Sequence, residues 1–271
     1  MSSYLITGVS RGIGFAFLRY ISADPANTVV GLVRDKVTTE KKVSEELGTR
    51  PNVHIIQADI TDYDSLKKSV DQVSPIVNGS LDYLIANAGY ISDWSAYHPL
   101  GSLGNDPQRL EDDLLECFRV NTIGNIHLFN LYMPLILKGG IKKVITLSSG
   151  FADNDLTTEY SIDVAGPYSI SKAAMNTAVA KFSAEYAGDG VLFMSIAPGA
   201  VEVGQDRNLT EDQIKNAVAL GAKFARYAPH FRGRTTPEES VKDMMSVIEG
   251  ASLASVHGGC FISHHGNKQW L

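Results

Sequence analysis

The sequence predicts a doubly wound α/β fold, in which helices cover both faces of a seven-stranded parallel sheet. Short runs rich in branched apolar residues alternate with longer amphipathic stretches, which is the pattern of βαβ units. A glycine-rich turn follows the first run, as expected of a tight strand-to-helix connection. With 271 residues, 44% of them hydrophobic, the chain is long enough to bury a hydrophobic core without support from disulfides or metals. We expect one domain over residues 1–271.

Seven runs have the composition of buried strands. Each is short, rich in Val, Ile, Leu, Tyr or Phe, and set off from the next by a longer helical or polar stretch. The first, YLIT, ends at the glycine turn, and the fifth, KVITL, ends at a pair of serines. In chain order the expected strands are residues 4–7, 28–33, 53–58, 83–86, 143–147, 191–196 and 259–262.

Five stretches between these runs show the amphipathic pattern of helices. Right-handed crossovers through them produce the doubly wound sheet. In chain order they are residues 14–22, 64–73, 107–137, 168–187 and 237–249. Three further segments are too long for simple connections, and we expect substrate-binding loops there, the last one a mobile cover. They are residues 91–106, 150–167 and 202–236.

Composition excludes several classes of protein. The chain carries 24 basic and 30 acidic side chains, a net charge of −6, which argues against binding nucleic acid or an anionic membrane surface. Cys117 and Cys260 are too far apart for a closely spaced metal cluster, and we expect buried free thiols. The first residues lack a basic leader, and no run of 18 apolar residues occurs, so we expect a cytoplasmic protein.

The glycine-rich turn over residues 7–14 reads TGVSRGIG and opens a helix. Glycines there let backbone N–H groups approach a pyrophosphate at the positive end of the helix, so the turn predicts dinucleotide binding. The alternative is a tight turn without a ligand.

The end of the second strand indicates which dinucleotide would bind. Arg34 stands there and suits a ribose 2′-phosphate, with Arg11 as a second cation, and this favours NADP(H). If the register of the strand were shifted by one residue, Asp35 would take this place and favour NAD. The other alternative is that Arg34 is a solvated surface cation without a ligand.

A polar constellation follows in the second half of the chain. Tyr168 and Lys172 are four residues apart in a predicted helix and share one face, so the ammonium is expected to lower the pKa of the phenol. Ser149 stands at a strand end, where open α/β sheets bind ligands, and Asn121 lies in the preceding long helix. Taken singly, each has an ordinary structural role, such as a cap or a solvated cation.

This set of motifs resembles, in order and register, the classical short-chain dehydrogenases/reductases, and within them the carbonyl-reductase and sniffer-like branch with its fungal ketoreductase relatives. The resemblance implies a Rossmann fold, Tyr168 as general acid in reduction, Lys172 on the nicotinamide ribose, Ser149 orienting the carbonyl, and Asn121 holding a relay water. It also implies a homodimer or homotetramer paired through the helices of Asn121 and Tyr168. The implied cofactor contacts, besides Tyr168 and Lys172, are Gly8, Ser10, Arg11, Gly12, Ile13, Gly14, Arg34, Asp59, Ile60, Asn87, Gly89, Pro198, Gly199 and Val201.

Two features depart from the family pattern. Ser149 and Tyr168 are 19 residues apart rather than about a dozen. The acidic residues of the longer loop between them could rim the mouth of the substrate pocket, but the default expectation is that they are solvated. They are Asp153, Asp155, Glu159 and Asp163. After Pro198-Gly199, Val203 stands where many relatives have a threonine that contacts the nicotinamide, so cofactor contact there is expected to be weaker.

The leading functional hypothesis is NADPH-dependent reduction of a ketone or aldehyde to an alcohol. The alternatives are a non-redox dehydratase or isomerase using the same pocket, and a binding module that senses NADP without turnover. The substrate is expected to be a small apolar, aromatic or polycyclic carbonyl compound. Possible walls of its pocket are Trp94, Tyr97, Phe224, Tyr227 and Phe231. No metal site is expected, since His257, His264 and His265 have no motif of metal ligands and are expected to lie in loops or at the surface.

Overall fold

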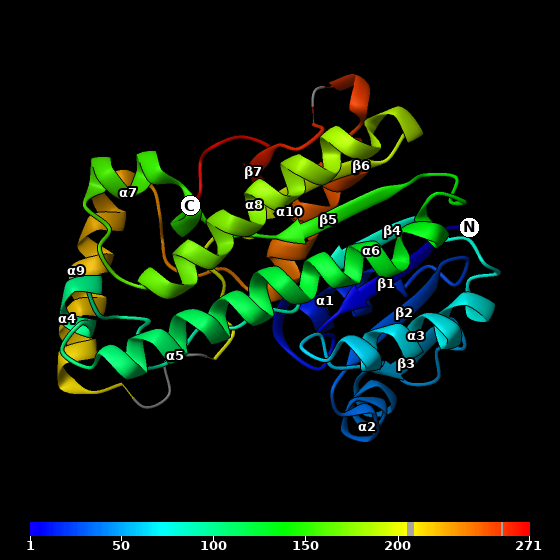
Figure 1. The fold of residues 1–271 in the computed structure, drawn as a ribbon, viewed down its shortest axis with the longest axis horizontal. Coiled ribbons are helices and arrows are strands. Elements are labelled where there is room, and N and C mark those ends of the chain that lie inside the picture. The colour runs from blue at the N-terminus through cyan, green and yellow to red at the C-terminus, as the bar shows by residue number, and fades with distance from the viewer. Residues whose placement is uncertain (205–208, 256) are drawn as a thin grey trace.

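The sheet of this protein is parallel throughout and follows the order β3-β2-β1-β4-β5-β6-β7 (Figure 1). The structure is a computed structural model, and it describes residues 1–204, 209–255 and 257–271. This topology confirms the predicted doubly wound Rossmann fold. The strands are β1 (Ser3–Thr7), β2 (Thr28–Val33), β3 (Val53–Gln57), β4 (Tyr83–Ala86), β5 (Lys143–Leu147), β6 (Leu192–Ala197) and β7 (Phe261–Ser263).

The strand order reverses at β1, which pairs with β2 on one side and β4 on the other. At such a switch point the connections leave in opposite directions and open a crevice at the carboxyl ends of the strands. The glycine turn after β1, Asn87 after β4, Ser149 after β5 and Pro198 after β6 therefore all lie at one edge of the sheet.

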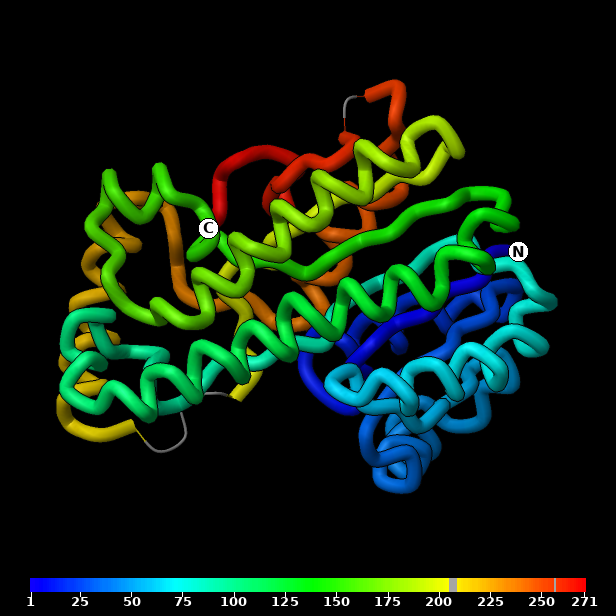
Figure 2. The backbone as a smooth tube through the Cα atoms, viewed as in Figure 1, coloured from blue at the N-terminus to red at the C-terminus, as the bar shows by residue number. Residues whose placement is uncertain are grey.

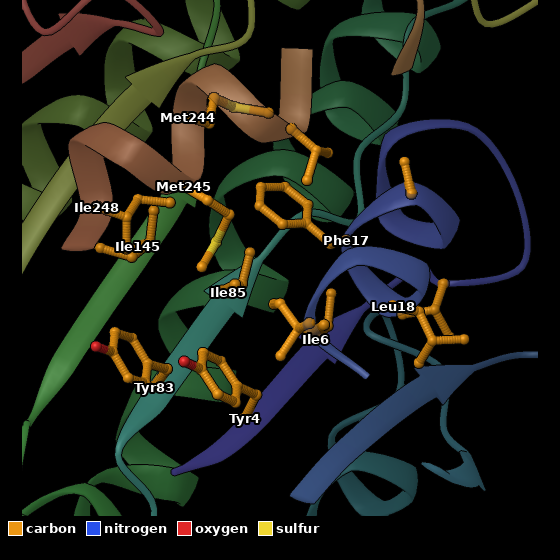
Figure 3. Packing of buried hydrophobic residues seen from close by; sticks show 14 of the residues in the cluster. Tyr4, Ile6, Phe17, Leu18, Tyr83, Ile85, Ile145, Met244, Met245 and Ile248 are labelled. Carbon is orange, nitrogen blue, oxygen red and sulfur yellow. The ribbon is translucent and has the colours of Figure 1, made fainter. Parts of the chain in front are cut away.

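Two apolar cores cover the two faces of the sheet. On one face Phe17 of α1 and Met244 of α10 pack with Ile6, Ile85 and neighbouring strand residues, as Figure 3 shows. On the other face α3, α6 and α8 contribute a second cluster. The helices of the first face are α1 (Gly12–Ile21), α2 (Lys36–Leu47) and α10 (Pro237–Gly250), and those of the second are α3 (Tyr63–Ile76), α6 (Gly124–Ile136) and α8 (Gly166–Tyr186).

The helix expected over residues 107–137 is divided by a wider turn. It consists of α5 (Pro107–Phe118), a π-helical turn η1 (Arg119–Ile123) and α6. Thr122 Oγ1 donates to the carbonyl of Ser171 in α8 at 2.9 Å, so the turn is fixed to its neighbouring helix. A single π turn of this kind is frequent at functional sites.

Part of the chain expected to be irregular is helical. Segment 202–236 contains α9 (Glu211–Tyr227), which starts with a capping box of Thr210 and Gln213, while residues 205–208 of that segment lie outside the described residues. Shorter helices occupy the other two expected loops, namely α4 (Leu100–Leu103) and α7 (Asn154–Tyr160). Short 3₁₀ turns lie before α7, after α8 and after α10, at Gly150–Ala152, Ala187–Asp189 and Leu253–Ser255. The helix α2 was not predicted, because only Thr39 and Val43 of its residues are buried and its apolar stripe is narrow.

The helices α4, α7 and α9 gather at one end of the molecule, beyond the carboxyl ends of the strands (Figures 1 and 2). A third apolar cluster holds this end together and includes Leu156, Leu220 and Trp270. An isolated antiparallel bridge joins Pro99 to Val164. Among the described residues, no helix has the length and apolar character needed to cross a membrane.

Candidate active site

The turn between β1 and α1 is a tight backbone loop. Gly8 has φ +75° and Gly12 φ +56°, values that favour glycine. A Cβ on Gly14 would overlap the carbonyl of Gly8 and lie 2.5 Å from the side-chain nitrogen of Asn87. Within the described chain, Arg11 makes no capping hydrogen bond at the start of α1, so the amides of that first turn keep their capacity to bind a ligand. The loop therefore fits a pyrophosphate.

Asn87 and Gly89 hold the neighbouring strand end against this loop. Asn87 Nδ2 donates to the carbonyls of Thr7 at 2.9 Å and Gly8 at 3.3 Å. The structure thus gives Asn87 a positioning role in the turn, in addition to the cofactor contact that the sequence predicts. Gly89 faces the catalytic candidates, since a Cβ there would lie 3.3 Å from Asn121 Oδ1 and 3.4 Å from Lys172 Nζ.

The ends of β2 and β3 carry the residues expected at the adenosine. Arg34 is exposed after β2, whereas Asp35 caps α2 by accepting from the N–H of Thr38 at 3.0 Å. Hydrogen bonds from the Thr38 hydroxyl and N–H lower the pKa of Asp35. Because its carboxylate is engaged in this cap, Asp35 is poorly placed to accept from a ribose hydroxyl. This arrangement favours the phosphate-binding choice, Arg34.

Asp59 and Ile60 follow β3. Burial raises the pKa of Asp59, but hydrogen bonds from Thr61 and the positive charges of Arg34 and Arg119 outweigh it, and the net shift is downward. Asp59 is therefore an anion with Arg34 in its electrostatic range. Ile60 packs against α6, where a Cβ on Gly124 would lie 2.5 Å from the Ile60 carbonyl oxygen.

A cavity of about 230 Å³ joins the candidate catalytic hydroxyls to the loop after β6. Its described lining includes six of the predicted site residues: Ile13, Ser149, Tyr168, Pro198, Gly199 and Val201. Val203 lines it as well, and a Cβ on Gly12 would lie 3.4 Å from Val203 Cγ1. Val203 therefore makes an apolar contact with the glycine turn.

Tyr168 is positioned by the first turn of α8, which begins with Gly166 and has Pro167 within its first positions. Burial raises the pKa of the phenol to about 12, although a hydrogen bond with Ser149 acts to lower it. The net pKa shift of the phenol is therefore upward, whereas the sequence predicts a pKa lowered by Lys172. The lysine Nζ lies 5.8 Å from the centroid of the phenol ring, and desolvation of the phenolate is the larger effect.

Lys172 is buried beneath the site and donates from Nζ to the carbonyl of Leu147 at 2.7 Å. Burial lowers its pKa to about 8, so the ammonium form still predominates at neutral pH. The lysine thus places a positive charge between α8 and the end of β5. Ser149 Oγ accepts from the N–H of Phe151 at 3.3 Å, which fixes the turn that carries it.

Asn121 lies in the π turn and ties three segments together. Its Nδ2 donates to the Tyr90 carbonyl at 2.8 Å and to Ser171 Oγ at 2.9 Å, while Oδ1 accepts from the N–H of Tyr90 at 2.8 Å. Its own carbonyl accepts from Asn125 Nδ2 at 2.9 Å. A relay water at this position would therefore use the remaining lone pairs of these oxygens.

His264 lies in the turn after β7, in agreement with the expected loop position, and it is buried with its ring against Gly199, where a Cβ would lie 2.7 Å from Cε1. One expectation about the acidic loop residues needs correction. Asp153 is buried and caps α7, because its carboxylate accepts from the N–H groups of Asp155 and Leu156. Asp163 is exposed, as expected, and forms an ion pair with Lys223 of α9.

The predicted aromatic walls are distributed over several environments. Tyr97 and Phe224 line the cavity, and Phe151, which was not predicted, stacks on Phe224 with ring centroids 6.0 Å apart. Trp270 is a second lining residue that the sequence did not indicate, since a single tryptophan near the chain end carries no local signal. Of the other expected walls, Trp94 packs under Arg109, Tyr227 against Tyr160, and Phe231 against Phe224.

The comparisons with known proteins agree with this geometry. A sequence model of the family described as short chain dehydrogenase matches residues 3–214, more than half of the chain. The chain belongs to the short-chain dehydrogenases. It is therefore an oxidoreductase of the short-chain dehydrogenase/reductase type, as the motifs predicted, and the matched span contains all four candidate catalytic residues.

Fungal proteins are among the relatives of this short-chain dehydrogenase. It is 57% identical over 271 residues to "Short chain dehydrogenase virK" of Hypocrea virens, with 100% of both chains covered. It is 48% identical over 272 residues to "Short-chain dehydrogenase/reductase iacC" of Pestalotiopsis fici, again with 100% of both covered.

Solved structures share the fold of the dehydrogenase at lower identity. NADPH-bound carbonyl reductase from chicken fatty liver has a TM-score of 0.78 at 24% identity, and the carbonyl reductase Sniffer of D. melanogaster 0.77 at 20%. Both alignments cover 98% of each chain.

Proposed function

We propose that this short-chain dehydrogenase reduces the carbonyl group of an apolar aromatic ketone or aldehyde with NADPH. The observation that carries the proposal is the single cavity lined by the hydroxyl-bearing residues Ser149 and Tyr168 and by Pro198-Gly199 of the loop after β6. A carbonyl oxygen bound between two hydroxyls is activated by hydrogen bonding as negative charge develops on it.

The cofactor choice rests on the glycine turn and on Arg34. The tight turn is supported by Gly14, where a Cβ would overlap the Gly8 carbonyl, and Asp35 is engaged as a helix cap. Arg34 and Arg11 would hold the 2′-phosphate, and Lys172 the nicotinamide ribose. When bound, NADPH supplies the hydride. The chicken carbonyl reductase, which has a similar fold, is NADPH-bound, and this supports the choice.

The residues of this chain supply the proton and the alignment. With a pKa raised to about 12, Tyr168 is protonated at neutral pH and is ready to donate its hydroxyl proton to the carbonyl oxygen. Ser149 donates a second hydrogen bond to that oxygen and orients it. Lys172 keeps a positive charge below the site, which stabilises the phenolate left after proton transfer.

The proposal is tested by incubating purified protein with NADPH and a panel of 1-tetralone, isatin and 9,10-phenanthrenequinone. We expect loss of NADPH absorbance in proportion to the alcohol formed from at least one of them. A product formed without oxidation of NADPH would instead identify a non-redox enzyme. NADPH binding without turnover of any compound in a broad carbonyl panel would identify a sensing module.

A first prediction concerns Arg34. Replacing it with glutamine removes the guanidinium from the 2′-phosphate, and we expect kcat/KM for NADPH to fall about tenfold while that for NADH stays within about twofold. Steady-state kinetics with the best carbonyl substrate measure both values. Lys67→Gln, which removes an exposed cation from α3, is the matched control and should leave both unchanged. Equal decreases in kcat/KM for NADPH and NADH would show that Arg34 does not recognise the 2′-phosphate.

A second prediction concerns pH. The phenolate fraction of a group with a pKa of about 12 rises tenfold per pH unit below that value. Oxidation of 1-tetralol by NADP⁺ needs the phenolate, so kcat/KM should rise about tenfold per unit between about pH 6 and pH 7.5. Reduction of 1-tetralone needs the phenol and should stay constant over the same range. A flat oxidation profile would show that Tyr168 does not accept the proton in the rate-limiting step.

Assembly and location extend the proposal. Exposed apolar residues on α5, the π turn and α8 support pairing of two copies through these helices, as a homodimer or within a homotetramer. They are Leu115, Phe118, Ile123 and Ile170. Both cysteines are free in the structure, which accords with a cytoplasmic location, and we propose that the whole chain acts as one domain.

A further inference from the structure

Three metal-ligating side chains from two elements meet beside the loop that follows β6. Asp243 comes from the exposed side of α10, and His264 and His265 follow directly after β7. One ligand atom from each of the three lies within 4.8 Å of the others. Such a convergence of residues 21 and 22 positions apart is made by the fold and not by a local sequence motif.

His264 is the fixed member of this cluster. The residue is 93% buried (7% exposed), and its backbone N–H donates to the Ala197 carbonyl at 2.8 Å. Its Nδ1 has no hydrogen-bond partner among the described residues. A buried polar atom without a partner is costly and uncommon in folded proteins, and here it points to a ligand.

Asp243 and His265 are the adjustable members. Both are exposed, and the rings of His264 and His265 have centroids 3.8 Å apart with planes tilted by 38°. We expect these two exposed side chains to rotate so that their donor atoms approach a shared ion. The N–H of His265 donates to Ser263 Oγ at 3.2 Å, which holds the main chain in place.

We propose that Asp243, His264 and His265 form a binding site for one divalent transition-metal ion of the zinc type, with water as the remaining ligand. Two imidazoles and one carboxylate are a donor set that zinc binds tetrahedrally, with metal–ligand distances of about 2.0–2.2 Å. The proposal departs from the sequence expectation that His264 and His265 bind no metal. The ion would join α10 to the segment after β7 and hold the His264 ring against Gly199, which lines the cavity.

The experiment is a titration of tag-free protein, first treated with a chelator, with Co²⁺ and then with Zn²⁺. We expect one equivalent of Co²⁺ to bind with the visible absorption of a tetrahedral site, and Zn²⁺ to displace it. His265→Ala and Asp243→Asn change exposed side chains that the fold does not need, and each should weaken binding by at least about tenfold. His257→Ala, which removes a histidine outside the cluster, should bind the metal as the unchanged protein does.

Two results would overturn the proposal. The first is the lack of binding at micromolar metal, and the second is equal binding by the unchanged protein and by both cluster variants, which would indicate an adventitious ion only. The titration needs neither NADPH nor a carbonyl substrate. Failure of the metal site and failure of the proposed reductase activity are therefore separate outcomes.

Discussion

Tyr168→Phe is expected to lower kcat for carbonyl reduction by about 10² to 10⁴, the range that general acid catalysis contributes. The substitution removes only the phenolic oxygen, which the structure places in the cavity with Ser149. Hydride delivery then leaves the charge on the carbonyl oxygen without a proton donor. Affinity for NADPH should change less than about threefold, because the glycine turn and Arg34 use other atoms.

The measurement compares single-turnover reduction with NADPH binding followed by protein fluorescence quenching. Tyr20→Phe is the matched control, since Tyr20 is an exposed tyrosine on α1 outside the cavity. It should retain full activity. If the Tyr168 variant kept more than about half of the rate, proton donation would have to come from another group, and the assignment of Tyr168 as general acid would be wrong.

Gly14→Ala should weaken NADPH binding by about 100-fold. The added Cβ overlaps the Gly8 carbonyl and lies 2.5 Å from Asn87 Nδ2, so the turn has to open and the hydrogen bonds of Asn87 to residues 7 and 8 are lost. Overpacking of this kind costs about 1–3 kcal/mol, and the upper end corresponds to about two orders of magnitude in affinity.

Gly221→Ala provides the control for this change. Gly221 lies in α9, and a Cβ there meets no atom within 4 Å among the described residues. It should bind NADPH normally and melt at the same or a higher temperature, because alanine favours a helix by about 1 kcal/mol over glycine. Circular dichroism of both variants separates a local effect on the turn from loss of the fold. Normal NADPH affinity in a folded Gly14→Ala protein would contradict the phosphate-binding role of this turn.

Much of the fold was predictable because local patterns encode it. The strands β1, β2, β4, β5 and β6 are short apolar runs that are buried almost throughout, and the glycine turn after β1 marks the switch point by its sequence alone. The helix α2 was missed because its apolar period is weak and only Thr39 and Val43 are buried. The helix α9 was missed because its segment was expected to be an irregular cover.

The candidate site was predictable only in part. The residues that line the cavity from strand ends and from α8 follow from motifs, but electrostatics and long-range packing do not. The pKa of Tyr168 depends on how deeply the ring is buried, which no spacing of residues reveals. Likewise, sequence gives no reason why His264 is buried while its neighbour His265 is exposed, because the difference comes from how the segment after β7 packs on Gly199.

The longer loop between Ser149 and Tyr168 packs against the helix α9. Asp163 of this loop pairs with Lys223, the ring of Tyr160 meets the edge of Tyr227 at 5.0 Å, and Arg226 donates to the Glu159 carbonyl at 3.2 Å. The two segments thus form one structural unit. Exchanging either of them alone with a relative would break these matched pairs, so transplanting substrate preference between family members requires moving residues 150–167 and 211–227 together.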